Sequence, residues 1–397
     1  MRSLLTLLFA LLASSSLASD IVIRKGTGKT SIDLSGMTFS ADTAARDFFT
    51  TLQTSLARSG WLEQGRPGAS EYRVSGPVQF DGATIRAQLT VAQVAPPRVV
   101  LTRTYNGSAA EVRRRAFEAA DDIVEEITGR RGFASARLLL VGRQGQAKEL
   151  YISDSDGRGM YPLTNDKKVI AAPRWGHDGR NIFYTANLTA FQGIYQIDLS
   201  TRKRFRIANY SGSNISGGVS PDGRYMAIIL SKDGNPELYV MRLSDRQLTR
   251  ITRTPRAVES SPSWSPDGRQ IVYVSDAAGT PHLYIVSREG GTPRQLTTRG
   301  RQNVSPDWGP DGEIVYSTLI GGKFQVCTIN PQSGMIRQLT SDYADHEDPS
   351  WAPNGRHIAV ARTEAYRSRV YLIDTMGDPP ILLVDTQGDW FAPKWSR

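Results

Sequence analysis

The phrase Pro262-Ser263-Trp264-Ser265-Pro266-Asp267-Gly268-Arg269 decides the fold, because versions of it recur from residue 173 to residue 397. Its glycine returns at steps of 44, 45, 44 and 43 residues, at Gly179, Gly223, Gly268, Gly312 and Gly355. A truncated copy, Pro393-Lys394-Trp395-Ser396-Arg397, follows 44 residues after the tryptophan of the copy before it. A repeat this regular indicates one structural unit per copy, stacked against its neighbours.

Each repeat contains four short strands. In the third copy, Trp264 ends the first strand, and Pro266-Asp267-Gly268 forms a tight turn because proline fixes φ and glycine accepts positive φ. Residues 270–274 and 282–286 alternate between outward and inward positions, as strands do, and residues 294–297 form the fourth strand. Four strands in about 44 residues are typical of a propeller blade.

The two ends of the repeat region complement each other. Residues 137–164 supply the second, third and fourth strands of a blade that has no first strand. The last copy, residues 393–396, supplies a first strand alone. The sequence therefore predicts an all-β six-bladed propeller in which the C-terminal strand completes the last blade and removes the exposed edges.

The repeated tryptophan is interpreted as packing rather than as a ligand site. One large aromatic side chain at a fixed place in each blade fills the space between neighbouring blades. Val219 replaces it in the second copy. We therefore expect that inter-blade contact to be less filled than the others.

The first 19 residues have the pattern of a cleavable secretory signal peptide. Met1-Arg2 is positively charged, residues 4–12 are apolar, and Ser16-Leu17-Ala18 places small residues before a cleavage site. No other long apolar run follows, so we expect no membrane insertion. Cys327 is the single cysteine, which excludes an intrachain disulfide and suits a buried strand position.

Residues 20–132 lack the repeat and predict a separate α+β domain. Apolar residues recur with helical spacing in residues 44–59 and 108–128, and several intervening segments alternate as strands. Gly129-Arg130-Arg131-Gly132 reads as the linker to the propeller, which we place at residues 133–397.

No pattern points to catalysis, a cofactor, a metal or nucleic acid. The net charge of +9 comes from scattered basic residues rather than from a basic groove. Gly26-Thr27-Gly28-Lys29-Thr30 lacks the first glycine of a phosphate-binding loop, and no G-x-S-x-G nucleophile motif occurs. Asp345-His346-Glu347-Asp348 favours a binding rim over a weak cation site.

Together these features resemble the TolB family of periplasmic propellers of the Tol–Pal envelope system. The most specific stretch is residues 119–133, which resembles the last helix of the family's first domain and its entry to the propeller. The resemblance implies a monomeric, non-enzymatic periplasmic adaptor that supports outer-membrane integrity and invagination at cell division. It implies a Pal-type peptidoglycan-associated lipoprotein bound by the propeller, and a TolA-type inner-membrane protein bound by the N-terminal segment Ile21-Val22-Ile23.

The repeat places the residues that the resemblance assigns to the Pal-type partner, in the loops that enter the first strand of each blade. Five positions before the tryptophan lie the residues of what we call the first row, and four positions before it those of the second row. The first row is Ile170, Asn214, Glu259, Asn303, His346 and Trp390. The second row is Ala171, Ile215, Ser260, Val304, Glu347 and Phe391.

The mixture of side chains in these rows predicts a recognition surface rather than a core. Trp390 and Phe391 suit desolvated anchors, whereas Glu259, Glu347 and Asp348 suit charged partners. The residues expected to bind the Pal-type partner are Asn214, Ile215, Glu259, Ser260, Asn303, Val304, His346, Glu347, Asp348, Trp390 and Phe391.

Two other classes of function stay open from the residues alone. One is a propeller hydrolase or lyase, which requires converging carboxylates with perturbed pKa values in a deep pocket. The other is a sensor for a peptide or glycan.

Overall fold

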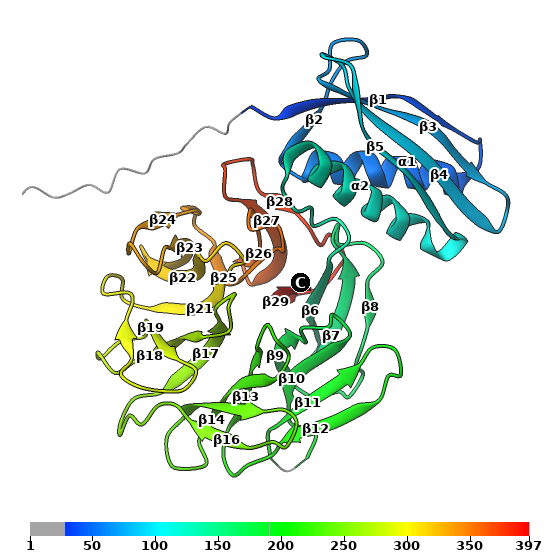
Figure 1. Cartoon of the computed structure of the whole chain (residues 1–397). Helices are drawn as coiled ribbons and strands as arrows, with labels where there is room; N and C mark the ends of the chain where they lie inside the picture. Colours follow the sequence, from blue (N-terminus) through cyan, green and yellow to red (C-terminus); the bar gives the residue numbers. More distant parts are fainter. Residues whose placement is uncertain (1–27, 190, 397) are drawn as a thin grey trace, which may run out of the picture.

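The computed structural model describes residues 28–189 and 191–396 (Figure 1). The predicted signal peptide at 1–19 and Ile21-Val22-Ile23 lie outside the described residues. An N-terminal α+β region is followed by a ring of six four-stranded sheets, as the repeat predicts.

The N-terminal region is a five-stranded sheet with two helices. Its strands are β1 (Thr30–Phe39), β2 (Leu62–Gln64), β3 (Tyr72–Phe80), β4 (Thr84–Gln93) and β5 (Arg98–Ser108), in the order β2-β1-β3-β4-β5. Its helices are α1 (Thr43–Arg58) and α2 (Val112–Thr128), the second preceded by the 3₁₀ turn η1 (Ala109–Glu111). The helices bury apolar side chains, among them Phe48, Leu52 and Ile123, in one core with the sheet.

Local chemistry sets the ends of these helices. The Asp42 carboxylate accepts a hydrogen bond from the Ala45 amide at 2.7 Å and caps α1. Gly129 adopts φ +64° directly after α2, a conformation that ends a helix with little strain in glycine. The helix expected over 108–128 starts slightly later because Ser108 and Glu111 form a capping box around the 3₁₀ turn.

The propeller blades are numbered here from the first complete repeat. Blade 1 contains β9 (Ile170–Trp175), β10 (Asn181–Ala186), β11 (Gly193–Asp198) and β12 (Arg204–Ala208). Blade 2 contains β13 (Asn214–Val219), β14 (Tyr225–Leu230), β15 (Glu237–Arg242) and β16 (Leu248–Arg250). Blade 3 contains β17 (Glu259–Trp264), β18 (Gln270–Ser275), β19 (His282–Ser287) and β20 (Arg294–Gln295).

The other three blades repeat this order. Blade 4 contains β21 (Asn303–Trp308), β22 (Ile314–Ile320), β23 (Lys323–Ile329) and β24 (Ile336–Gln338). Blade 5 contains β25 (Asp345–Trp351), β26 (His357–Glu364), β27 (Arg367–Asp374) and β28 (Ile381–Leu382). Blade 6 combines β29 (Trp390–Trp395) with β6 (Arg137–Gln144), β7 (Ala147–Asp154) and β8 (Tyr161–Pro162).

The closure of the ring is confirmed. Strand β29 pairs antiparallel with β6, with Trp390 opposite Gly142 and Trp395 opposite Leu138. In Figure 1 the red C-terminal strand lies beside the first propeller strand. The last strand thus covers the edge that β6 would otherwise expose.

The propeller core lies between blades, and the repeated tryptophan belongs to it. Six separate clusters of buried apolar residues each join two neighbouring blades. Five of them contain a repeat tryptophan, namely Trp175, Trp264, Trp308, Trp351 and Trp395. The interpretation as packing is confirmed.

The junction between blades 1 and 2 differs, as expected. Val219 takes the tryptophan position there, and a cavity of about 280 Å³ lies between the two blades. Phe183, Phe205 and Leu243 line it with Val219. The smaller side chain leaves space that an indole fills elsewhere.

Candidate partner-binding face

The strand order gives the propeller two faces with different contents. We call the side with the loops that enter each first strand, and that join the second strand to the third, the loop face. We call the opposite side, with the Pro-Asp-Gly turns, the turn face. Successive strands run in opposite directions, so every blade contributes to both.

The N-terminal region docks on the turn face, over blades 5 and 6. The guanidinium of Arg113 in α2 lies 3.2 Å from the carboxylate of Asp154, the last residue of β7, and 2.8 Å from that of Asp156 in the turn that follows. Arg356 of blade 5 stacks over Trp61 at 4.4 Å from the ring centroid. These contacts leave the loop face uncovered by the described residues.

The first row does not form an exposed surface, which corrects the expectation for Asn214, Glu259, Asn303, His346 and Trp390. All six side chains of the row are at most 6% exposed. The repeat gave their shared position correctly, but it could not tell whether that position faces solvent or the loop before it.

Five of the six residues instead hold their own entry loop. The amide of Asn214 donates to the Tyr210 carbonyl at 2.8 Å, and that of Asn303 donates to the Arg299 carbonyl at 2.9 Å. His346 Nε2 lies 2.9 Å from the Asp342 carboxylate. Each bond spans four residues, and it fixes the loop that precedes the strand.

Glu259 and Trp390 close their loops in the same way. The Thr254 hydroxyl donates to the Glu259 carboxylate at 3.0 Å, and the Trp390 indole donates to the Thr386 carbonyl at 3.2 Å. Burial raises the pKa of Glu259 to about 7, against the opposing effect of the hydroxyls of Thr254 and Ser275. The first row is therefore a support for the rim rather than its surface.

The second row does reach the surface. Glu347 is exposed, and Ile215, Ser260, Val304 and Phe391 are half-buried. Asp348, the next residue, is also half-buried and accepts a hydrogen bond from the Ser305 hydroxyl at 2.8 Å. Arg143 and Lys148 lie over the Phe391 ring at 5.1 and 4.9 Å from its centroid.

A bulge separates the two rows from the strand that follows. In five blades the residue after the second row has φ between +46° and +52°, at Ala172, Ser261, Ser305, Asp348 and Ala392. The ladder shifts register directly after the second row in these five blades, and one residue later, between Ser216 and Val219, in blade 2. Such a bulge redirects side chains at a rim, so simple alternation from the tryptophan misjudges which row is exposed.

Sequence reasoning missed the most exposed aromatic residues of the loop face. Tyr343, in the loop before β25, is 94% exposed, and Tyr366, between β26 and β27, is 97% exposed. Val258, directly before β17, and Ile320, the last residue of β22, add smaller exposed apolar side chains. An apolar residue inside a polar loop was the available signal, but it does not recur between copies.

Exposed arginines lie in the entry loops of two blades on this face. Arg253 and Arg256 precede blade 3, and Arg299 and Arg301 precede blade 4. None of the four forms an ion pair with the described residues. The loop face therefore combines aromatic anchors with unpaired positive charge, which suits a protein partner with acidic groups.

The acidic cluster around His346 holds no cation site. The Asp345 carboxylate accepts hydrogen bonds from the Lys323 ammonium at 2.8 Å and from the Phe324 amide at 3.0 Å. Among residues 28–189 and 191–396, no group of three or more His, Cys, Asp and Glu side chains is arranged to hold a metal ion. In the same part of the chain no helix has the length and apolarity needed to cross a bilayer.

The fold and the open face define a class, namely a six-bladed propeller that carries an α+β region on its turn face. The chain belongs to the TolB beta propeller domain family, whose pattern matches residues 124–397. The crystal structure of TolB from Acinetobacter baumannii is similar along nearly the whole chain. It has a TM-score of 0.81 and 25% identity, and the match covers 94% of this chain and 98% of that one.

Curated relatives are similar in sequence to this chain over shorter segments. The Tol-Pal system protein TolB of Francisella tularensis subsp. tularensis (strain WY96-3418) is 36% identical over 159 residues, which is 38% of this chain and 37% of the relative. The protein of the same name from Bordetella avium (strain 197N) is 31% identical over 251 residues, or 58% of this chain and 57% of the relative. The match thus spans well under half the length of the Francisella relative.

Proposed function

We propose that this protein is a non-enzymatic periplasmic adaptor of the Tol–Pal envelope system, built from functional units at residues 20–132 and 133–397. The proposal rests on the contrast between a turn face occupied by the N-terminal region and a loop face that the described residues leave uncovered. Relatives named Tol-Pal system protein TolB support the assignment to this system. An adaptor of this kind would support outer-membrane integrity and invagination at cell division.

The loop face is the proposed site for a Pal-type lipoprotein. Glu347, Ser260 and the outer edge of Phe391 would contact it, with Ile215, Val304 and Asp348 beside them. Tyr343 and Tyr366 would serve as anchors, because exposed tyrosines provide large apolar area and a polar end. The first row would act indirectly by holding the loops in one conformation.

A binding role agrees with how the polar groups at the channel mouth are used. The Glu259 carboxylate and the His346 ring are buried and engaged with their own loops. Neither is placed to receive a substrate proton, which favours an adaptor over a hydrolase or lyase.

Calorimetric titration with the soluble domain of a Pal-type lipoprotein tests this proposal. We expect saturable binding that is weakened at least about tenfold by Glu347→Ala/Phe391→Ala. The turn-face variant Arg180→Ala is the matched control and should bind as the parent does. Equal binding by the parent, the double variant and the control would show that the loop face is not the binding site. No binding at all would favour a peptide or glycan sensor.

The N-terminal segment is the proposed site for a TolA-type protein. Ile21, Val22 and Ile23 lie outside the described residues, so this part rests on the family resemblance alone. Coupling between the two sites predicts that deletion of residues 20–28 changes the affinity for the Pal-type domain. Unchanged affinity after the deletion would refute the coupling.

A further inference from the structure

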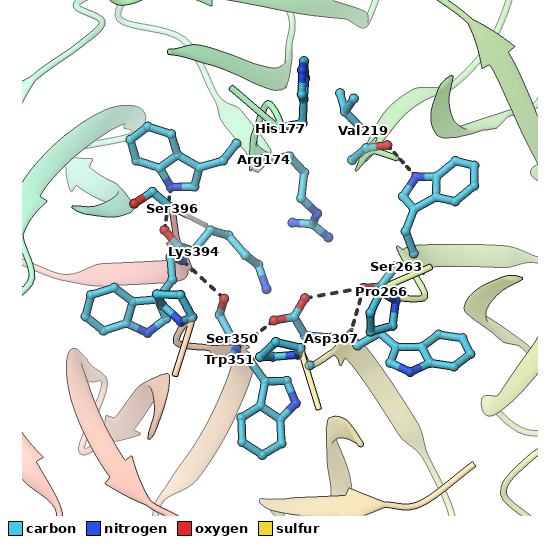
Figure 2. A pocket seen from close by; sticks show the side chains of 18 of the residues that line it. Arg174, His177, Val219, Ser263, Pro266, Asp307, Ser350, Trp351, Lys394 and Ser396 are labelled. Carbon is cyan, nitrogen blue, oxygen red and sulfur yellow. Dashed lines mark hydrogen bonds between the residues drawn. The ribbon is translucent and has the colours of Figure 1, made fainter. Parts of the chain in front are cut away.

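A cavity of about 280 Å³ lies in the central channel at the turn-face end, away from the proposed partner site. Its wall contains the five repeat tryptophans and the residues directly before them in the first strands. Its size is near the lower limit of small-molecule pockets. Figure 2 shows Arg174, Lys394 and Asp307 pointing into it from three different blades.

The position before the tryptophan has a structural task in three blades. The Ser263 hydroxyl accepts the Trp308 amide at 3.0 Å, and the Asp307 carboxylate accepts the Trp351 amide at 2.8 Å. The Ser350 hydroxyl accepts the Trp395 amide at 3.4 Å. Each bond crosses to the next blade, so an acceptor at this position joins neighbouring first strands.

Arg174 and Lys394 hold the same position in blades 1 and 6 but cannot perform this task, because their charged groups only donate. Within residues 28–189 and 191–396, the Arg174 side chain makes one hydrogen bond, from Nη1 to the Pro173 carbonyl at 2.9 Å. Lys394 is 7% exposed and donates to the Pro349 carbonyl at 3.2 Å. Neither forms an ion pair within the described part of the chain.

Two such cations in a cavity are costly without a counter-charge. Burial lowers the pKa of Lys394 to about 8, which reflects this cost. Asp307 lines the cavity, and its charge and that of Asp348 partly oppose this lowering. The hydrogen bonds that Asp307 accepts from the Trp351 amide and the Ser263 hydroxyl leave acceptor capacity free. The cavity therefore offers donors for an oxyanion on one side and an acceptor on the other.

We propose that this cavity binds a small zwitterion with a carboxylate and an ammonium group, such as a free amino acid or the end of a short peptide. The carboxylate lies between Arg174, whose planar fork suits it, and Lys394. The ammonium group donates to Asp307. The cavity lies toward the opposite end of the channel from the loop face, and of the residues proposed at the Pal-type site only Asp348 acts on the charges of Arg174 and Lys394.

The test uses the chain without its predicted signal peptide and the probe L-alanyl-L-alanine. Tryptophan fluorescence is the readout, since the repeat indoles line the cavity. We expect a saturable change, with affinity weakened about tenfold or more by Arg174→Gln and by Lys394→Met. Arg180→Gln is the matched control, because Arg180 pairs with Asp198 at 2.7 Å outside the cavity.

Derivatives of the probe identify the groups that are recognised. The C-terminal amide should bind about tenfold or more weakly, and the N-acetyl derivative should lose affinity only when Asp307 is intact. Asp307→Asn keeps an acceptor for the Trp351 amide, so it should fold and lose this discrimination. Lys394→Met removes a buried charge and should also stay folded, which thermal melts check.

Three results would overturn the proposal. They are the absence of a saturable signal, equal losses from Arg174→Gln and Arg180→Gln, and tighter binding of inorganic phosphate than of the dipeptide.

Discussion

The two faces of the propeller are made by the same strands, yet they differ in what they leave open. On the turn face, charged groups at the blade ends are used within the chain, as in the contacts of Arg113 with Asp154 and Asp156. On the loop face, buried polar residues fix the loops from below, and aromatic and basic side chains project outward. A regular repeat can therefore build one face for internal docking and the other for a partner.

The largest expected effect is a loss of partner affinity that occurs for substitutions on the loop face and not for those elsewhere. Tyr343→Ala/Tyr366→Ala should weaken binding of the Pal-type domain by at least about 3 kcal/mol, more than about a hundredfold, because both side chains are nearly fully exposed and free to act as anchors. Calorimetry measures the change. Phe205→Ala, an exposed aromatic residue away from the loop face, should leave the affinity unchanged. A similar loss in both proteins would contradict the distinction.

The next effect concerns a buried proton beneath the loop face. Glu259 has a folded-state pKa of about 7, above its ordinary value of 4.5, so the folded state holds a proton that the unfolded state releases. Its stabilising contribution is complete below pH 4.5 and declines as the pH rises through 7. In denaturant titrations, Glu259→Gln should remove this decline. Its free energy of unfolding should exceed that of the parent by up to about 3 kcal/mol at pH 8.

Asp267, a carboxylate on the turn face, should make stability depend on pH in the opposite direction from Glu259. The Ser265 hydroxyl lowers the pKa of Asp267, so its contribution is present above the unfolded pKa and is lost as the pH falls. Asp267→Asn should therefore lower the free energy of unfolding at neutral pH, and its difference from the parent should disappear in acid, where Asp267 is protonated. For Glu259, the free energy of unfolding of the parent and of Glu259→Gln should depend on pH differently between pH 4.5 and 8. The same pH dependence in both proteins would refute the assignment of a buried proton.

A smaller effect tests the docking of the N-terminal region. Arg113→Ala removes the ion pairs to Asp154 and Asp156 and should lower the free energy of unfolding by about 1–2 kcal/mol, since these groups are partly buried. Limited proteolysis should cut the 129–133 segment faster. Affinity for the Pal-type domain should not change, and a marked loss would mean that docking on the turn face shapes the loop face.

The smallest expected effect is at the junction that lacks a tryptophan. Val219→Trp should fill the cavity between blades 1 and 2 and raise the free energy of unfolding by about 1 kcal/mol in denaturant titrations. Binding on the loop face should stay the same. A destabilised variant would show that the cavity cannot accept an indole in its present shape.

The repeat allowed the ring, its closure and the weak junction to be predicted, because spacing and a constant tryptophan depend only on sequence order. It located the entry loops of the blades but not the exposure of the first row. A bulge with positive φ, as at Ser261 and Asp348, and bonds back to the loop, as from Asn303 to Arg299, decide that exposure. Tyr343 and Tyr366 escaped prediction because their loops differ between copies.

Hydrogen exchange with and without the Pal-type domain shows directly which face of the propeller binds it. We expect added protection in the loop-face segments 253–258, 339–344 and 385–389, and unchanged exchange in the Pro-Asp-Gly turns at 266–268 and 310–312. Protection confined to those turns would refute binding on the loop face, because it would place the partner on the face where the N-terminal region docks.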